Sequence, residues 1–483
     1  MRGFTRREAH DLGLKYVMDL METSSPFGKA HKRTILPFEE NQEQELLKEL
    51  SRTKELSLRL TEREEEYATL KESLLELKDI RRTIVCMMEG HVLSELDLFE
   101  IKFLLRKIQE IAERGKVFLL PEESPVPMEE ALSLLDPDGT GLSTFHVYDS
   151  YDPKLKEIRI RKKAIEKFIR SDEGEENLSR LLFERRKVVL EEEEEEYAVR
   201  RRLTEALLPH GDGILSNMDP LGRLDFLLAK AKLAAQYDTV VPEVGRHCII
   251  SMVNGYHPYF EYLLGKRGKD FKRVSMEIGH GSTVITGANM GGKSITLKTV
   301  FLNVVLVQMG ILPFAEKMTT PILRTMNLLA EDLENPDKGL SSFGGEVVRL
   351  REIMEELQEC PSLIVLDEPF RGTNPLEGKA MAGGLVSHFR HSRHFLLMAT
   401  HYDLGGMEDI HRYQVRGLKD VDLKAYMDTS PENQITQVGL LSELMDYTLE
   451  KWDGGENVGD AVRIGEFLGL DRELTMEIRK LLK

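Results

Sequence analysis

Residues 286–300 contain a glycine-rich loop followed by an apolar segment, and read TGANMGGKSITLKTV. The spacing of Gly287, Gly292, Lys293 and Ser294 matches the pattern G-x-x-x-x-G-K-[ST]. Glycines let backbone N–H groups close around phosphate oxygens, and the N-terminus of a following helix favours negative charge. The expected phosphate-binding loop comprises Gly287, Ala288, Asn289, Met290, Gly291, Gly292, Lys293 and Ser294. The flanking apolar residues predict a strand before the loop and a buried helix after it, which disfavours the alternative of a chance glycine turn.

Two further apolar runs end on polar residues that suit phosphate chemistry. LIVLDEP carries Asp367 and Glu368 after its apolar part, and FLLMATHYD carries His401 after its apolar part. Because ligands bind at the carboxyl ends of parallel strands, we expect Asp367 to join Ser294 in holding Mg²⁺ and Glu368 to orient or deprotonate the attacking water. The imidazole of His401 would sense the γ phosphate. A helix cap is the alternative for the two acids, and a structural role is the alternative for the histidine. Together the three runs predict binding and hydrolysis of ATP.

The elements that must position these residues divide the chain near residue 240. Over residues 41–120 and 155–236, apolar residues recur at spacings of three and four, which indicates amphipathic helices. After residue 239, short β-rich runs alternate with helical stretches, as in a parallel sheet flanked by helices. We therefore predict the fold class α + α/β, with a helical domain at residues 1–240 and a P-loop (ABC-type) domain with a largely parallel sheet at residues 241–483.

Composition limits the classes of protein that the chain can represent. A chain of 483 residues with 41% hydrophobic and 31% charged residues predicts a multidomain globular protein. Its three cysteines are far apart, which disfavours a disulfide framework or a zinc site. We find no signal peptide and no apolar run that reaches membrane-spanning length, so we expect a cytoplasmic protein with no membrane partner. The net charge of -17 argues against a chain wrapped wholesale around nucleic acid but permits a local basic surface.

Several motifs resemble those of the MutS family of DNA mismatch repair ATPases. TGANMGGKS resembles the family's TGPNMGGKS loop, LDEPFRGTNPLEGKA its DE-x-x-RGT-x-x-x-x-G-x-A segment, and ATHYDL its ATHY. NGYHPYFE, LSSFGGEV and GEFLGLDREL are similar to the family's entry motif, its S-T-F-M-x-E signature and its C-terminal helix. LMETSSPFGKAHKRTILPF and LGRLDFLLAKAKLAAQYDTVVPEV extend the resemblance into the helical half. It implies a core, lever and clamp domain followed by an ATPase and dimerisation domain.

The resemblance also implies roles for individual residues. Asn289 would help to position the γ phosphate, and His401 would act as a switch histidine. Ser341 would reach the nucleotide of the opposite subunit, so that the composite site requires a homodimer. The cofactors would be ATP and Mg²⁺.

The sequence departs from the family pattern at several positions. Gly344 and Gly345 replace the signature's Met and the following residue, which puts coupling between subunits in doubt. In the loop, Ala288 replaces the family's proline, and Ile295 replaces a threonine. We find no mismatch-reading domain and no nuclease extension after the C-terminal helix, so we expect a short MutS-like protein that does not read mismatches.

A run of six glutamates at residues 191–196 predicts long helices that protrude into solvent, because buried like charges would repel one another. DNA contacts could come from the basic run before it, whose members are Arg159, Arg161, Lys162, Lys163, Lys167 and Arg170. A solvated helix face explains this run equally well.

Two functions are compatible with these features. The first is an ATP-switched homodimeric clamp that engages DNA of unusual structure. The second is an ATP-dependent remodelling or reactivating chaperone for a protein partner such as a metabolic enzyme, which the acidic charge balance favours. An ATPase whose dimer is structural or regulatory only is a third alternative.

Overall fold

A computed structural model describes residues 6–142, 144–171, 175–287, 292–330, 342–404, 407–418, 446–452 and 460–481. The predicted fold class is confirmed: the N-terminal part is helical, and a mostly parallel sheet follows it. The chain forms two compact units, which we call the sheet unit (Met1–Met21, Leu36–Ser57 and Leu233–Lys483) and the helical unit (Glu22–Ile35 and Leu58–Lys232). Two N-terminal segments are thus part of the sheet unit. The division into family domains at residue 240 stays a prediction.

The main sheet of the sheet unit has six strands in the order β10-β9-β4-β8-β7-β6. All neighbouring pairs are parallel except β10 and β9. The strands are β4 (Gly281–Thr286), β6 (Met326–Leu329), β7 (Leu363–Asp367), β8 (Phe395–Ala399), β9 (His411–Gly417) and β10 (Asp446–Lys451). In this register Ile285 pairs with Ala399, and Ala399 pairs with Asp367. The carboxyl ends of β4, β8 and β7 therefore meet at one edge of the sheet.

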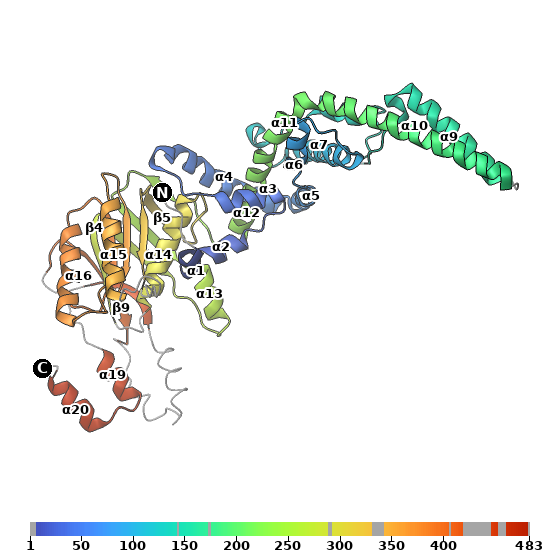
Figure 1. The fold of residues 1–483 in the computed structure, drawn as a ribbon. Coiled ribbons are helices and arrows are strands. Elements are labelled where there is room, and N and C mark those ends of the chain that lie inside the picture. Colours follow the sequence, from blue (N-terminus) through green and yellow to red (C-terminus); the bar gives the residue numbers. More distant parts are fainter. Residues whose placement is uncertain are drawn as a thin grey trace. The chain divides into compact units, whose positions relative to one another are not determined.

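Helices cover both faces of this sheet (Figure 1). Helix α14 (Lys293–Gln308) packs on β7 and β8, and also on β2 of a second sheet. That sheet has the order β1-β5-β2-β3 and comprises β1 (Glu243–Gly245), β2 (Ile249–Gly255), β3 (Val274–Gly279) and β5 (Lys317–Pro321). Contact with two sheets explains why α14 is apolar on all sides. On the opposite face of the main sheet, α15 (Ser342–Glu356) and α16 (Pro375–Phe389) bury Ile353, Val386 and Phe389 against the strands.

The N-terminal helices α1 (Arg6–Asp11) and α2 (Leu14–Leu20) join the sheet unit through a buried histidine. His257, which precedes α13 (Pro258–Gly265), places its Nε2 atom 2.9 Å from the carbonyl oxygen of Leu12. Its ring lies so close to Gly13 that a Cβ there would be 2.4 Å from the imidazole. Burial lowers the pKa of His257 to about 4. The histidine of the NGYHP motif therefore has a structural role in this fold.

The helical unit confirms the predicted amphipathic helices. Leu98, Ile101, Leu105 and Ile108 of α7 are fully buried at spacings of three and four, and α7 packs on α5. The helices of this unit are α3 (Pro26–Thr34), α5 (Glu64–Leu75), α6 (Arg81–Met88), α7 (Glu95–Gly115), α8 (Glu129–Leu135), α9 (Pro153–Ser171), α10 (Glu175–Leu207) and α11 (Gly211–Ser216). The chain passes between the units at four points: after Met21, after Ile35, within α4 (Glu43–Glu62) and within α12 (Met218–Gln236).

A buried carboxylate joins α3 to α12 inside the helical unit. Asp225 accepts hydrogen bonds from the backbone N–H groups of Ser24 and Ser25, at 2.9 and 2.6 Å, and from the Ser25 hydroxyl at 2.7 Å. Gly28 is required beside it, since a Cβ there would lie 2.1 Å from the carboxylate. These contacts explain the SSPFG sequence at the start of α3.

Helices α9 and α10 lie side by side as a long hairpin, which we call the arm (Figure 1). Leu155, Ile158 and Val188 are among its few buried side chains, so most of its surface faces solvent. The prediction of long protruding helices around the glutamate run is consistent with this hairpin. The C-terminal helices of the sheet unit are α19 (Asp460–Phe467) and α20 (Arg472–Leu481). Among the described helices, none has the length and apolar character needed to cross a membrane.

Candidate nucleotide site

The predicted phosphate-binding loop lies in the chain between the central strand β4 and the buried helix α14. Gly287 and Gly292 have positive φ angles of 136° and 77°, which favour glycine. Lys293 begins α14; its side chain is buried, and its Nζ atom lies 2.7 Å from the carbonyl oxygen of Gly287. Ser294 is exposed on the first helical turn. The other residues predicted for the loop, 288–291, lie outside the described part of the chain.

Glu368 meets the lysine of this loop directly. Its Oε1 atom lies 3.2 Å from Nζ of Lys293, and Oε2 lies 3.4 Å from the Arg371 guanidinium. The Nδ1 atom of His401 is 4.0 Å from the same Oε2 atom. Glu368 is only 8% exposed, so water screens these charges weakly. The structure thus brings three of the predicted site residues, Lys293, Glu368 and His401, into one cluster.

Sheet topology explains this convergence. Strand β8 lies between β4 and β7, so residues just beyond the three strand ends are neighbours. Asp367 is the last residue of β7, and Ser294 is on the first turn of α14. Carboxylate and hydroxyl oxygens are the hard donors that Mg²⁺ prefers. The donor set of Asp367 and Ser294 therefore fits the predicted metal.

The turn after Glu368 has an unusual backbone that the sequence did not reveal. Glu368 and Phe370 have positive φ angles of 48° and 63°, which non-glycine residues rarely adopt. The N–H group of Phe370 donates to Oε2 of Glu346 at 2.9 Å, and its carbonyl accepts from the Tyr402 hydroxyl at 3.1 Å. Sequence reasoning missed Arg371 and Glu346 as parts of this site. The only signal for Arg371 was its place in the RGT motif, three residues after Glu368.

An aromatic residue from the edge strand also reaches the loop. A Cβ at Gly292 would lie 3.0 Å from the Tyr447 ring, so this ring lies directly against the loop. Sequence analysis nominated no aromatic residue near the nucleotide, because Tyr447 lies far along the chain and in no recognised motif. Ser341, predicted to act across a dimer, lies outside the described residues.

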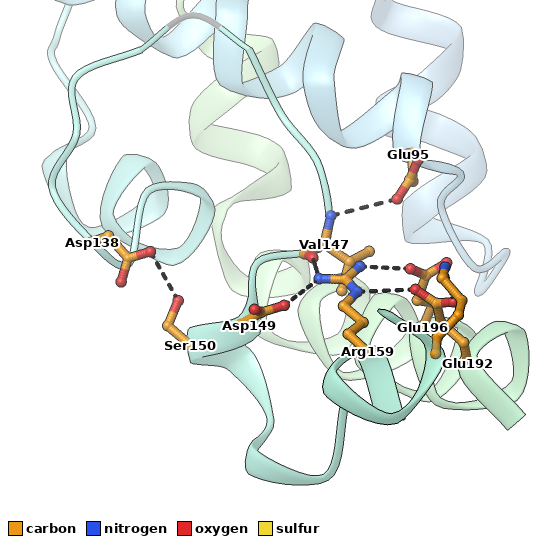
Figure 2. A network of polar contacts seen from close by, with 9 residues as sticks. Glu95, Asp138, Val147, Asp149, Ser150, Arg159, Glu192 and Glu196 are labelled. Carbon is orange, nitrogen blue, oxygen red and sulfur yellow. Dashed lines mark hydrogen bonds and ion pairs between the residues drawn. The ribbon is translucent and has the colours of Figure 1, made fainter. Parts of the chain in front are cut away.

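The basic run of the arm divides into paired and unpaired residues. Figure 2 shows Arg159 between the arm's two helices, with Nε 3.1 Å from Glu192, one terminal nitrogen 2.6 Å from Glu196 and the other 2.6 Å from Asp149. Although burial disfavours its charged form, these hydrogen bonds raise the pKa of Arg159. Arg161 pairs with Glu191, and Lys162 also pairs with Glu192. These three cations therefore help to hold α9 to α10.

The remaining predicted cations lie toward the distal end of the arm. Lys163, Lys167 and Arg170 are exposed and have no ion-pair partner among the described residues. Arg186 and Lys187 of α10 are also exposed. We call these five residues the distal basic cluster. Phe168 and Phe183 are 63% and 60% exposed on the same part of the arm.

A glycine-rich loop between a central parallel strand and a buried helix, with its lysine facing an acidic strand end, defines a P-loop nucleotide-binding domain. Comparison with known proteins gives a narrower class. Residues 283–438 match the family model for MutS domain V. This part of the chain is therefore similar to MutS proteins.

Similar proteins include several named Endonuclease MutS2. The protein of Symbiobacterium thermophilum is 28% identical over 282 residues, which cover 58% of this chain and 32% of that protein. The protein of Acetivibrio thermocellus is 32% identical over 201 residues, which cover 40% of this chain and 24% of that protein. The protein of Leuconostoc citreum is 29% identical over 210 residues, which cover 42% of this chain and 25% of that protein. The chain thus matches between about a quarter and a third of the length of these relatives.

Proposed function

We propose that this protein is a Mg²⁺-dependent ATPase of the MutS type that works as a homodimeric, ATP-switched clamp on DNA of unusual structure, without reading mismatches. The observation that carries the proposal is the cluster of Lys293, Glu368 and His401 at the edge where three parallel strands end. The match of residues 283–438 to the MutS domain V model supports the same activity.

The residues of the cluster divide the chemistry among them. The loop from Gly287 to Ser294 binds the triphosphate, and Lys293 neutralises charge on the β and γ phosphates. Glu368 orients the attacking water and takes its proton, and His401 responds to the γ phosphate. Asp367 and Ser294 would hold Mg²⁺, which neutralises phosphate charge when it is bound.

Lys293 also makes the surroundings of Glu368 depend on whether nucleotide is bound in the loop. Its Nζ atom is within 3.2 Å of Glu368 and 2.7 Å of the Gly287 carbonyl oxygen. A phosphate in the loop competes with Glu368 for this lysine, because a doubly charged oxyanion group is the stronger partner. Nucleotide binding therefore frees the carboxylate to act on water.

The arm is the proposed contact with DNA. Its distal basic cluster is exposed, whereas the cations closer to its base are neutralised by glutamates. Lys and Arg contacts to phosphates carry no sequence information, which suits a clamp that recognises shape. The composite ATP site, with Ser341 of each subunit at the nucleotide of the other, makes the homodimer part of the proposal.

The test is steady-state ATP hydrolysis by the full chain, alone and with homoduplex, mismatched, branched and single-stranded DNA at two salt concentrations. We expect branched DNA to change the rate more than homoduplex or mismatched DNA, and the effect to fade as salt rises. ATP hydrolysis that is indifferent to every DNA would contradict the DNA role and favour the protein-client alternative. Absence of hydrolysis under all conditions would contradict the ATPase itself.

A further inference from the structure

The turn that carries Glu368 is held from two sides by side chains outside the β7 strand. Glu346 of α15 accepts the N–H of Phe370 at 2.9 Å, and Tyr402, which follows β8, donates to the Phe370 carbonyl at 3.1 Å. A Cβ at Gly378 would lie 2.2 Å from the Tyr402 hydroxyl, so this packing also depends on a glycine in α16. Every polar backbone atom of Phe370 is thus bonded to a side chain.

This support is needed because the turn has a strained backbone. Positive φ angles at both Glu368 and Phe370 persist only where the surroundings determine them. Phe370 is 2% exposed, and its ring meets the Phe343 ring of α15 edge to face at 6.5 Å. Helix α15 therefore contributes both an apolar and a polar contact to one residue of the turn.

The same contacts determine where the Glu368 carboxylate points. Glu368 is two residues before Phe370, and its own N–H donates to the Ala399 carbonyl at 2.9 Å, which fixes the start of the turn. With the start fixed on β8 and Phe370 fixed on α15, little freedom is left for the intervening backbone. Burial raises the pKa of Tyr402, and the charges of Glu346 and Glu368 add to this effect, as expected for side chains grouped around one turn.

We infer that Glu346 is a positioning residue for ATP hydrolysis, which acts through Phe370 to hold Glu368 in place for water activation. The inference rests on the proposed function and deepens it, because it makes the first turns of α15 a control point for the reaction. Gly344 and Gly345 precede Glu346, and two glycines lower the intrinsic stability of this part of the helix. The contacts with Phe370 therefore add to the order of this part of the helix.

The test compares Glu346→Ala with Glu346→Gln, and uses Glu355→Ala as a matched control. Glu355 lies on the same helix in an exposed pair with Arg351, away from the turn. We expect Glu346→Ala to lower kcat about 10- to 100-fold with nearly unchanged ATP affinity, since misplacing a catalytic group mainly slows the chemical step. Glu346→Gln keeps an oxygen acceptor and should restore most of the rate.

A double variant tests whether Glu346 acts through Glu368. In a Glu368→Gln background, Glu346→Ala should cause little further loss of turnover, because the carboxylate that it positions is already gone. Losses that multiply in the double variant, or a Glu346→Ala enzyme with normal kcat, would overturn the inference.

Amide hydrogen exchange tests the same contact without ATP turnover. Glu346→Ala should speed exchange at the N–H of Phe370, while Glu355→Ala should leave it unchanged. Unchanged exchange in Glu346→Ala would refute the positioning role even if the ATPase is confirmed. A wild-type protein that hydrolyses no ATP would refute the proposed function and, with it, the catalytic part of this inference.

Discussion

At the residue scale, the buried ion pair between Lys293 and Glu368 is the main feature of the site. The two side chains are 4% and 8% exposed, and their charged atoms are 3.2 Å apart. Removing one member of a buried pair leaves the other charge in a medium that solvates it poorly. Arg371, at 3.4 Å, still neutralises Glu368 when the lysine is lost. Substitutions here should therefore affect function more than folding.

Lys293→Ala and Glu368→Gln should have different effects on the nucleotide. Lys293→Ala removes a charge-assisted contact to phosphate, so we expect ATP binding to weaken by about 10- to 100-fold. Glu368→Gln removes the base but leaves the loop, so binding should persist while turnover falls by at least about 100-fold. Equilibrium binding of a fluorescent ATP analogue and steady-state hydrolysis measure the two effects. Normal turnover in either variant would show that the site has been assigned wrongly.

His257 should make the sheet unit less stable in mild acid. Its pKa is lowered to about 4 in the folded state, against an ordinary value of 6.5. Above pH 6.5 the imidazole of His257 is neutral in both the folded and the unfolded state, so it does not change the free energy of unfolding. As pH falls from 6.5 to 4, the imidazole takes up a proton in the unfolded state but stays neutral in the folded state. The free energy of unfolding should fall by roughly 3 kcal/mol across this window.

The measurement is urea unfolding between pH 7.5 and 4.5, with His257→Gln as the comparison. The variant keeps an N–H donor for the Leu12 carbonyl but has no titrating group. We expect it to be less stable at neutral pH and to lose less stability in acid. Equal pH dependence in both proteins would mean that other groups dominate.

At the element scale, the arm combines two uses of charge. Arg159, Arg161 and Lys162 pair with glutamates of the neighbouring helix, so the run of six glutamates partly serves to join the two helices. The distal basic cluster has no such partners among the described residues. Only the distal part of the arm therefore presents a positive surface.

This difference predicts which cations matter for DNA. Replacing Lys163, Lys167 and Arg170 together with Gln should weaken binding and lower the slope of log K against log salt concentration by about 2 to 3, one unit for each lost phosphate contact. The control replaces Lys154, Arg201 and Arg202, which pair with Glu195, Glu205 and Asp152, and changes the net charge equally. Fluorescence anisotropy with a labelled DNA junction measures both. Equal effects in the two triple variants would indicate a net-charge effect only.

At the scale of the whole molecule, the proposed composite site makes activity depend on two chains. Each nucleotide would contact Lys293 of one subunit and Ser341 of the other. The chain passes between the two units at four points, and two of them lie within helices α4 and α12. These two helices are therefore continuous covalent routes by which ATP at the sheet unit could affect the helical unit. These proposals require a dimer that forms at working concentrations.

Mixing two inactive variants tests the composite site. Lys293→Ala and Ser341→Ala should each hydrolyse ATP slowly, but a mixed dimer contains one site in which both residues are intact. After subunit exchange, half of the dimers are mixed, so activity should recover to about a quarter of wild type. The control is Lys293→Ala mixed with Glu368→Gln. Both residues belong to the same half of the composite site, so neither site of this mixed dimer is intact and activity should not recover. Failure of the first mixture to regain activity would refute the shared site.

Much of the candidate nucleotide site could be predicted from sequence because its parts are local. The loop motif is one continuous segment, and each acidic or imidazole residue directly follows an apolar strand whose length and composition identify it. The same reasoning predicted the amphipathic helices, since the spacing of Leu98, Ile101, Leu105 and Ile108 is visible within one helix. It gave no role to Glu346, although Glu346 lies in the LSSFGGEV motif, and it did not single out Tyr447; both reach the site from segments far along the chain.

The sequence by itself therefore determined a candidate phosphate-binding loop, the strand ends that accompany it and the alternation of elements that forms the sheet. Only the tertiary structure decided that Lys293 contacts Glu368, that Glu346 holds the following turn, and that half of the predicted basic run is neutralised. It also decided that residues 1–21 and 36–57 belong to the sheet unit. The physical reason is that periodicity and loop chemistry act over a few residues, whereas these contacts depend on strand order and on which helix faces pack together.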